Sequence, residues 1–173
     1  PPTRRRRPPT ARPAAPSTVI DKLSRLFGMQ GPIRQAIAEG MPMLGTCAGL
    51  IMLADTVLDA IDGQESFGGL DVVVRRNAFG RQLESFEAEL DVPALGAPAV
   101  KAAFIRGPVV DAVGPRASVV AALDDGHVVA VEQGGLLGLS FHPEITGETR
   151  FHKRFLAHVT ATRARSGRTG LEG

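Results

Sequence analysis

Hydrophobic and polar positions divide the chain into short apolar runs separated by glycine, proline and charged residues. Near the start, Ser17 or Thr18 can cap a short helix that Gly28 is placed to end. A second helical stretch begins at Pro32 and ends before Gly40. The pattern therefore predicts two short helices before the first strand. The apolar face expected on the first helix consists of Ile20, Leu23, Leu26 and Phe27.

The next apolar run is interrupted by small residues at its centre. Met41 to Leu44 predicts a short buried strand, and Leu50 to Ala54 has helical character. Between them stands Gly-Thr-Cys-Ala-Gly at positions 45–49. This order predicts a strand, a tight turn and a helix.

The rest of the chain predicts mainly strands. Polar residues 59–69 are expected to form a loop, and strands are expected at 70–74, 84–92, 99–105, 119–123, 127–131 and 136–141. Asp124-Asp125-Gly126 is a hairpin turn signal between two of them. A final helix is expected from about Glu148 to Ala161. Its apolar face would consist of Phe151, Phe155, Leu156 and Val159. Helices early and mixed strands later indicate a three-layer α/β domain.

Length and composition add limits to this picture. A chain of 173 residues suits one domain with a single core, which we place at residues 17–162 between a tail at 1–16 and a frayed end at 163–173. No apolar run approaches the roughly 20 residues that cross a bilayer, so no membrane span is expected. The single cysteine rules out an internal disulfide and fits a reducing compartment, so we expect a cytoplasmic location.

The basic pI of the chain, about 9.2, is caused by the arginines in its first 16 residues. These contain five arginines, six prolines and no acid; without the five arginines, 15 Lys and Arg remain against 18 Asp and Glu, a balance of about −3. A solvated arm is the favoured interpretation, because such sequence cannot bury a core. Binding to nucleic acid is the less favoured alternative, since the chain has no Trp or Tyr for base stacking.

Cys47 is the candidate nucleophile. A thiol reacts poorly until it loses its proton, and free cysteine titrates near ~8.5. At a strand-to-helix turn the positive end of the helix dipole would face the sulfur and lower its pKa. Gly45 and Gly49 would permit the sharp bend, and the N–H of Ala48 would point at the developing oxyanion. The alternative is that Cys47 is a small buried apolar residue, the commonest fate of a free cysteine.

His142 is the candidate base. The other three histidines lie beside the hairpin turn or on the final helix, where solvated or packing roles are expected. His142 directly follows a predicted strand, and Pro143 keeps it out of helical geometry. A carboxylate such as Glu144, bonded to one ring nitrogen, leaves the other free to accept the thiol proton. Cys47, His142 and Glu144 could thus act as nucleophile, base and orienting group.

Two segments that contain these residues resemble the triad (class I) glutamine amidotransferases: Gly-Thr-Cys-Ala-Gly-Leu at 45–50 and Ser-Phe-His-Pro-Glu at 140–144. Segments 20–23, 75–87 and 104–106 are more closely similar to the glutaminase subunit of pyridoxal 5′-phosphate synthase. Among amidotransferases, the Arg-Asn-x-Phe-Gly-Arg-Gln block at 76–82 is specific to that subunit. The resemblance covers about residues 17–159. It implies a three-layer, flavodoxin-like mixed sheet that is truncated at its N-terminal side.

The resemblance also implies a reaction and a partner. Cys47 would attack the side-chain amide of L-glutamine, and His142 would protonate the departing ammonia. Arg76, Ile105 and Arg106 would contact the glutamine, since a guanidinium can bond both oxygens of an α-carboxylate. Without the resemblance, surface ion pairs are the favoured roles of the two arginines. Ammonia would pass to a (β/α)8-barrel synthase subunit that also activates the glutaminase, and no cofactor or metal is expected in this chain.

One segment departs from the family pattern. Family members have Pro-Gly-Gly-Glu-Ser-Thr just before the first helix, where the glycines supply an oxyanion-hole amide. Here residues 13–18 read Pro-Ala-Ala-Pro-Ser-Thr, and we expect the first βαβ unit of the family to be absent. We expect the tail to come from a truncated or frame-shifted gene start, which mass spectrometry of the native protein would test.

Several functions remain open from the sequence. An intact Cys47, His142 and Glu144 favour a working glutaminase subunit, whereas the altered oxyanion segment favours an impaired relative that only binds the synthase subunit. Losing one oxyanion donor costs about 10²–10³ in rate. A nucleic-acid-binding protein is the least favoured class, and the block at 76–82 argues against another amidotransferase specificity.

Overall fold

The computed structural model of the protein describes residues 15–76 and 85–169, with side chains to residue 164. Most of the Arg/Pro-rich tail and most of the Arg-Asn-x-Phe-Gly-Arg-Gln block lie outside the described residues. Four α-helices are present in the described part: α1 (Pro16–Leu26), α2 (Gln30–Ala38), α3 (Ala48–Leu53) and α4 (Arg150–Thr169). None of them is long and apolar enough to cross a membrane.

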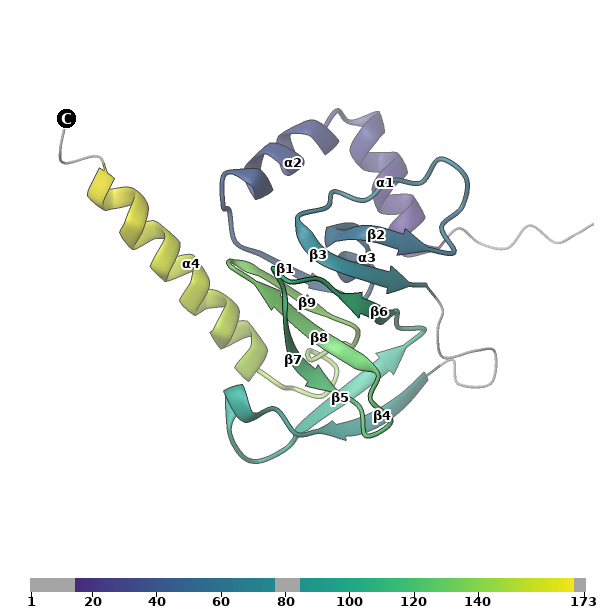
Figure 1. The fold of residues 1–173 in the computed structure, drawn as a ribbon, viewed down its shortest axis with the longest axis vertical. Coiled ribbons are helices and arrows are strands. Elements are labelled where there is room, and N and C mark those ends of the chain that lie inside the picture. Colours follow the sequence, from purple (N-terminus) through teal and green to yellow (C-terminus); the bar gives the residue numbers. More distant parts are fainter. Residues whose placement is uncertain (1–14, 77–84, 170–173) are drawn as a thin grey trace, which may run out of the picture.

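The strands form one mixed sheet and one two-stranded sheet (Figure 1). The main sheet has the order β1-β9-β8-β6-β3-β2, with β7 paired to β8. Within it, β1 pairs parallel with β9 and β2 parallel with β3, while the other pairs are antiparallel. The second sheet pairs β4 antiparallel with β5. The strand bounds are β1 (Met43–Thr46), β2 (Ala54–Leu58), β3 (Leu70–Arg75), β4 (Ser85–Leu90), β5 (Val100–Ile105), β6 (Val109–Val113), β7 (Ser118–Ala122), β8 (Val128–Gln133) and β9 (Leu136–Leu139); a 3₁₀ turn covers Pro93–Leu95.

Two buried apolar clusters hold these layers together. One joins the main sheet to α3, through residues such as Leu50, Leu70 and Val74. The other joins the main sheet to the β4–β5 pair and to the start of α4, where Phe104, Phe141 and Phe151 meet. Figure 1 shows α1 and α2 on one side of the molecule and the β4–β5 pair at the opposite end, with α4 along a third side. The α/β class with a mixed sheet is confirmed.

Most expected elements are present with shifted ends. The strand expected at Met41 to Leu44 is β1, two residues later, and the Asp-Gly hairpin is the β7–β8 pair. Strands β2 and β6 were not expected. The final helix continues to Thr169, past Ala161, where fraying was expected. Because all four residues of β9 are buried, this strand has no alternating pattern to reveal which face lies inward.

The orientation expected for α1 is wrong. Its expected core face is exposed, with Leu26 at 74% and Phe27 at 71%, whereas Ser17, Thr18, Asp21 and Ser24 are buried. Most of the buried polar side chains have hydrogen-bond partners: Ser17 and Thr18 bond the side chain of Gln64, and Ser24 bonds a backbone carbonyl within the helix. Asp21 pairs with Arg25 through Oδ2, while its Oδ1 is buried without a partner. Ser17 and Thr18 therefore do not cap the helix, whose N-cap is Ala15. Satisfied polar groups can be buried at little cost, so the apolar pattern did not decide which face lies inward.

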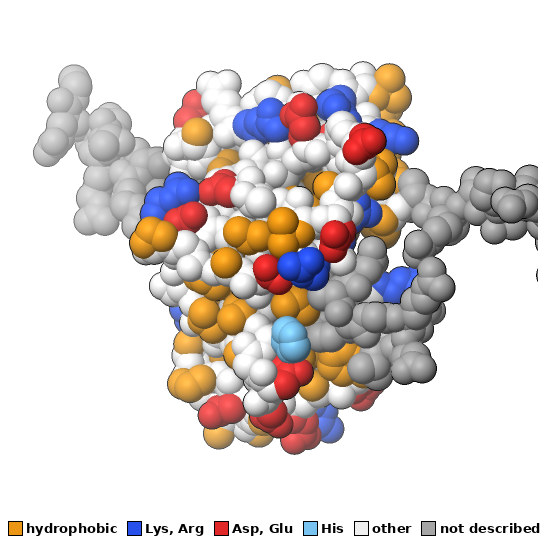
Figure 2. All heavy atoms as spheres, turned by 45° about the vertical axis from the view of Figure 1, so that its right-hand side comes forward, with side chains coloured by type: hydrophobic (Ala, Val, Ile, Leu, Met, Phe, Trp, Pro, Cys, Tyr) orange, Lys and Arg blue, Asp and Glu red, His pale blue; other side chains and the backbone are white. Residues whose placement is uncertain are grey.

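A smaller correction concerns α4. Phe151 is fully buried and Phe155 packs against the same cluster, as expected, but Leu156 is 58% exposed. The contacts of α4 with this apolar cluster lie in its first two turns, whereas Arg154 and His158 reach Glu132 on β8 through polar contacts. Figure 1 shows the helix running along one side of the molecule. Figure 2 shows that the described surface on one side has acidic and basic side chains interspersed among apolar ones.

Candidate active site

Cys47 lies in a strained turn between β1 and α3. Its backbone has φ 49° and ψ −103°, a region that L-residues rarely occupy. The turn is held because the Cys47 N–H donates to the carbonyl of Leu139 on β9, at 2.7 Å. A β-carbon added at Gly45 would lie only 2.6 Å from the carbonyl carbon of Gly49, so Gly45 lets the start of α3 approach β1 closely. Such strain of about 1–3 kcal/mol is typical of functional turns.

His142 reaches the same edge of the sheet by a second route. Strands β1 and β9 are parallel neighbours in register, with Thr46 opposite Leu139. Cys47 therefore follows one strand where His142 follows the other, three residues beyond Leu139. The carboxyl ends of parallel strands meet at one edge, which is the usual place for a site in an α/β sheet.

Strand β5 brings the two groups closer together. The N–H of His142 donates to the carbonyl of Ala103 at 2.9 Å, and the Cys47 sulfur lies 3.7 Å from the carbonyl oxygen of Ile105. Those two carbonyls are two residues apart on one strand, about 7 Å along its length. The thiol and the imidazole thus both border the end of β5, and Ile105 contacts the sulfur through its backbone.

Glu144 orients the imidazole. Its Oε1 lies 2.7 Å from Nδ1 of His142, so the second ring nitrogen, Nε2, remains available to exchange a proton with the thiol. Burial alone would raise the pKa of Glu144, but the hydrogen bond to His142 helps to bring that pKa below its ordinary value. Thr146 anchors the loop, because its hydroxyl bonds the carbonyls of Lys101 and Pro143 at 2.7 and 3.2 Å.

The expected low pKa of Cys47 is wrong for this chain by itself. Burial raises the pKa of the thiol, the N–H of Ala48 lowers it, and the negative charge of Glu144 raises it further, so the pKa lies above its ordinary value. The helix α3 has only six residues, and its N-terminus does not outweigh the loss of water around the sulfur. The raised pKa favours the protonated thiol of Cys47 at neutral pH in this chain by itself.

Arg76 lies in a separate cluster at the end of β3. Its guanidinium bonds Gln64 and Thr18, and the residue is only 6% exposed. Burial lowers its pKa, and the charge of Asp59 raises it in part. The cluster is joined to the Cys47 turn through α1, which packs against α3. Arg106 directly follows β5 with a positive φ of 48°, next to the Ile105 carbonyl at the sulfur.

The structure therefore brings together Cys47, Ala48, Ile105, His142 and Glu144, and places Arg76 in a second cluster linked by a helix. Gln64 and Thr146 were missed by the sequence analysis. Neither has a sequence signal, since Gln64 bonds Thr18 and Arg76, 46 and 12 positions away, and Thr146 bonds Lys101, 45 positions away. Among the described residues, no group of three or more His, Cys, Asp and Glu side chains could hold a metal ion.

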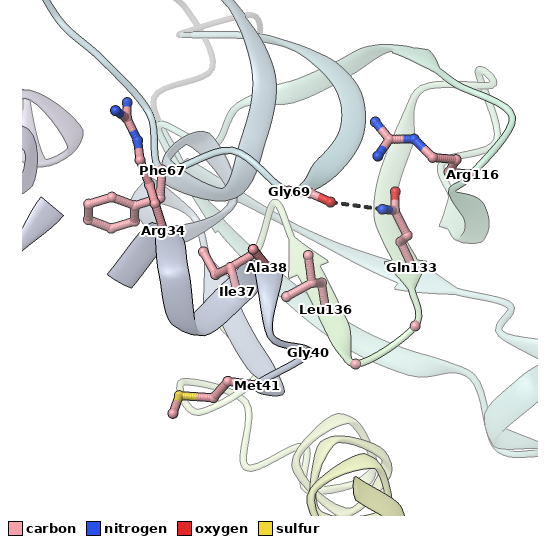
Figure 3. Close-up of a pocket in the computed structure, with 12 residues that line it drawn as sticks. Arg34, Ile37, Ala38, Gly40, Met41, Phe67, Gly69, Arg116, Gln133 and Leu136 are labelled. Atoms are coloured by element: carbon pink, nitrogen blue, oxygen red, sulfur yellow. Dashed lines mark hydrogen bonds between the residues drawn. The ribbon is translucent and has the colours of Figure 1, made fainter. Parts of the chain in front are cut away.

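A cavity of about 490 Å³ lies elsewhere (Figure 3). Gly40 and Met41 line it just before β1, and Gly134, Gly135 and Leu136 line it at the start of β9. It therefore borders the amino ends of the two strands whose carboxyl ends lead to Cys47 and His142. Figure 3 shows the Gln133 side chain at its edge, bonded to the Gly69 carbonyl. This cavity is not the candidate active site.

Comparison with known proteins agrees with this geometry. Residues 11–161 match the model of the SNO glutamine amidotransferase family. The pyridoxal 5′-phosphate synthase subunit PdxT of Clavibacter michiganensis subsp. michiganensis is 67% identical over 147 residues, which cover 85% of this chain and 70% of the relative. PdxT of Streptomyces coelicolor is 54% identical over 152 residues, covering 88% and 75%. A crystal structure of a glutamine amidotransferase superposes with a TM-score of 0.75 at 43% identity, covering 82% of this chain and 74% of the other. The chain belongs to the SNO glutamine amidotransferase family.

Proposed function

We propose that this chain is the glutamine-hydrolysing subunit of a pyridoxal 5′-phosphate synthase. The observation that supports this most directly is the meeting of a strained cysteine turn with a His142–Glu144 pair at the ends of adjoining parallel strands. The high identity to PdxT proteins supports the choice of synthase. A reactive thiol and the single cysteine suit a reducing compartment, so the proposed location is cytoplasmic.

The reaction follows from the roles of three side chains. His142 Nε2 takes the proton of the Cys47 thiol as the sulfur attacks the amide carbon of the L-glutamine side chain. The N–H of Ala48, already directed at the sulfur, is placed to stabilise the oxyanion. The carbon–nitrogen bond breaks, His142 protonates the leaving nitrogen, and ammonia departs. Water then cleaves the thioester, which returns the thiol and releases glutamate.

The proposal extends to substrate binding and ammonia transfer. Arg76 and Arg106 would bind the charged end of glutamine, and Ile105 would line the site beside the sulfur. Ammonia would pass to the (β/α)8-barrel synthase subunit without release to solvent. Because the pKa of the resting thiol is raised, the isolated chain is expected to be slow until glutamine and the synthase subunit are bound.

The raised thiol pKa also favours one alternative, an impaired relative that binds the synthase subunit without turnover. Ammonia release from L-glutamine, measured with and without the synthase subunit, separates the two. A working subunit releases ammonia in the complex, and the Cys47→Ala variant of the same complex does not. Formation of the complex with no release from the unaltered chain would favour the alternative.

A further inference from the structure

A neutral hydrogen-bonded cluster surrounds the guanidinium of Arg76. Its Nη1 donates to Oε1 of Gln64 at 2.6 Å, and its Nη2 donates to the Thr18 hydroxyl at 3.4 Å. The Thr18 hydroxyl also donates to Gln64 Oε1 at 3.0 Å, and Gln64 Nε2 donates to the Ser17 hydroxyl at 3.3 Å. Gln64 is therefore the centre of the cluster and joins the end of β3 to the first turn of α1.

Arg76 differs in its partners and its burial from the described arginines that form ion pairs. Six of those have a carboxylate partner within 3.2 Å, and all six are substantially exposed or half-buried. Arg76 is 6% exposed, and in the described part of the chain its hydrogen-bond partners, Gln64 and Thr18, are neutral. The six pairs are Arg25–Asp21, Arg34–Glu65, Arg75–Asp111, Arg116–Asp55, Arg150–Glu148 and Arg154–Glu132.

Burying a guanidinium without a paired anion is costly, and hydrogen bonds to neutral groups offset that cost only in part. A buried, unpaired charge is therefore consistent with a site that receives an anion from a ligand. Burial lowers the pKa of Arg76, and the charge of Asp59 offsets this only in part. An amide at position 64 supplies an oxygen that directs the guanidinium yet leaves its positive charge unneutralised. A carboxylate at the same place would both direct the guanidinium and neutralise it.

We propose that Gln64 is a positioning residue that directs the guanidinium of Arg76 for the α-carboxylate of the bound substrate. This inference rests on the proposed function. Gln64, a loop residue, would determine both how tightly the α-carboxylate of the substrate binds and how well the site distinguishes it from a neutral group. Ser17 and Thr18 hold the Gln64 amide in turn, so α1 links this cluster to the helix that follows Cys47.

The test compares two changes at Gln64 in the complex with the synthase subunit. Gln64→Glu introduces a carboxylate that competes for Arg76, and the KM for L-glutamine should rise about 10-fold or more, the size of a lost charge-assisted hydrogen bond. Gln64→Met keeps the volume and removes the acceptor, so KM should rise less. In both variants kcat should change far less than KM, because the thiol and imidazole are untouched.

Selectivity supplies a readout that a structural role would not change. The unaltered complex should prefer L-glutamine to L-glutaminamide, which has a carboxamide in place of the α-carboxylate, and this preference should collapse in Gln64→Glu. Gln35→Glu is the matched control: it adds the same charge at an exposed glutamine of α2 and should leave KM and preference unchanged. A lower kcat with unchanged KM and preference would overturn the inference.

Binding separates this inference from the proposed function. L-glutamine affinity is measured by calorimetry in the Cys47→Ala background, where no turnover is needed. Weaker binding after Gln64→Glu supports the role of Gln64 even if the unaltered complex releases no ammonia, a result that would refute only the glutaminase function. Equal affinity with and without Gln64→Glu, or no glutamine binding at all, would overturn the role of Gln64.

Discussion

Replacing Gly45 by alanine tests the close approach that shapes the Cys47 turn. The new β-carbon would lie 2.6 Å from the Gly49 carbonyl carbon, 2.7 Å from its oxygen and 2.9 Å from the Leu50 nitrogen. Carbon atoms in contact normally stay about 3.5–4.0 Å apart. All three neighbours are backbone atoms, so no side chain can rotate to make room. The start of α3 must therefore move away from β1 by about 1 Å.

Two magnitudes follow from this displacement. Overpacking of a core costs about 1–3 kcal/mol in the free energy of unfolding, which urea denaturation followed by circular dichroism can measure. A shift of about 1 Å in a reacting group costs about 10² in rate, because the attacking atom loses its alignment. Gly45→Ala should therefore lower the denaturation midpoint and reduce ammonia release from glutamine in the synthase complex by about that factor.

Gly49→Ala is the matched control. No atom lies within 4 Å of a β-carbon added at Gly49, and its φ is not positive. Because Gly49 lies in α3, alanine should stabilise the chain by about 0.5–1 kcal/mol through lower entropy of the unfolded state. Its ammonia release should stay near that of the unaltered chain. The reasoning is refuted if Gly45→Ala matches the unaltered chain in both assays, or if both variants lose activity equally.

Three further predictions follow from the site and the fold. Glu144→Gln removes a charge that raises the pKa of Cys47, so iodoacetamide should alkylate that thiol faster at pH 8, as seen by mass spectrometry, while ammonia release falls about 10²–10⁴-fold; slower alkylation would contradict this. Thr146→Val removes a hydrogen bond to a backbone carbonyl of β5 and should cost about 1 kcal/mol in urea denaturation, whereas an unchanged midpoint would argue against that anchor. Leu26→Lys should change stability by less than about 0.5 kcal/mol because Leu26 is exposed. Ser24→Lys, on the buried face, should cost more than about 2 kcal/mol by the same measurement, and the reverse order would contradict the orientation of α1.

The local chemistry was predictable because it depends on neighbours in sequence. A cysteine between small residues at a strand-to-helix junction indicates a strained turn, and the structure has Cys47 at φ 49°. Proline between His142 and Glu144 keeps the two side chains close, and the structure joins them at 2.7 Å. The hairpin at Asp124-Asp125-Gly126 was predictable for the same reason, since its turn is specified by two or three residues.

Properties that depend on distant partners were not predictable. Burial under the fold raises the pKa of Cys47 by more than the N–H of Ala48, at the start of α3, lowers it, and the charge of Glu144 raises it further. Strand β2 is short and directly follows helix α3, and β6 is short and directly follows a Gly-Pro pair. Neither therefore has a clear strand pattern of its own, and each forms a strand because it pairs with neighbours in the sheet.

The sequence by itself therefore determined the turn at Cys47 and the His142–Glu144 pair, because each depends on a few contiguous residues. It also indicated the family to which the chain belongs, because several short segments carry the family's motifs. Only the tertiary structure decided which face of α1 is buried and which residue holds Arg76. The apolar stripe of α1 predicted that its apolar face would be buried. Instead the polar face is buried, where Thr18 bonds Gln64, a loop residue 46 positions further along the chain. Hydrogen bonds between segments far apart in the chain leave no periodic pattern, so they become visible only when the segments are folded together.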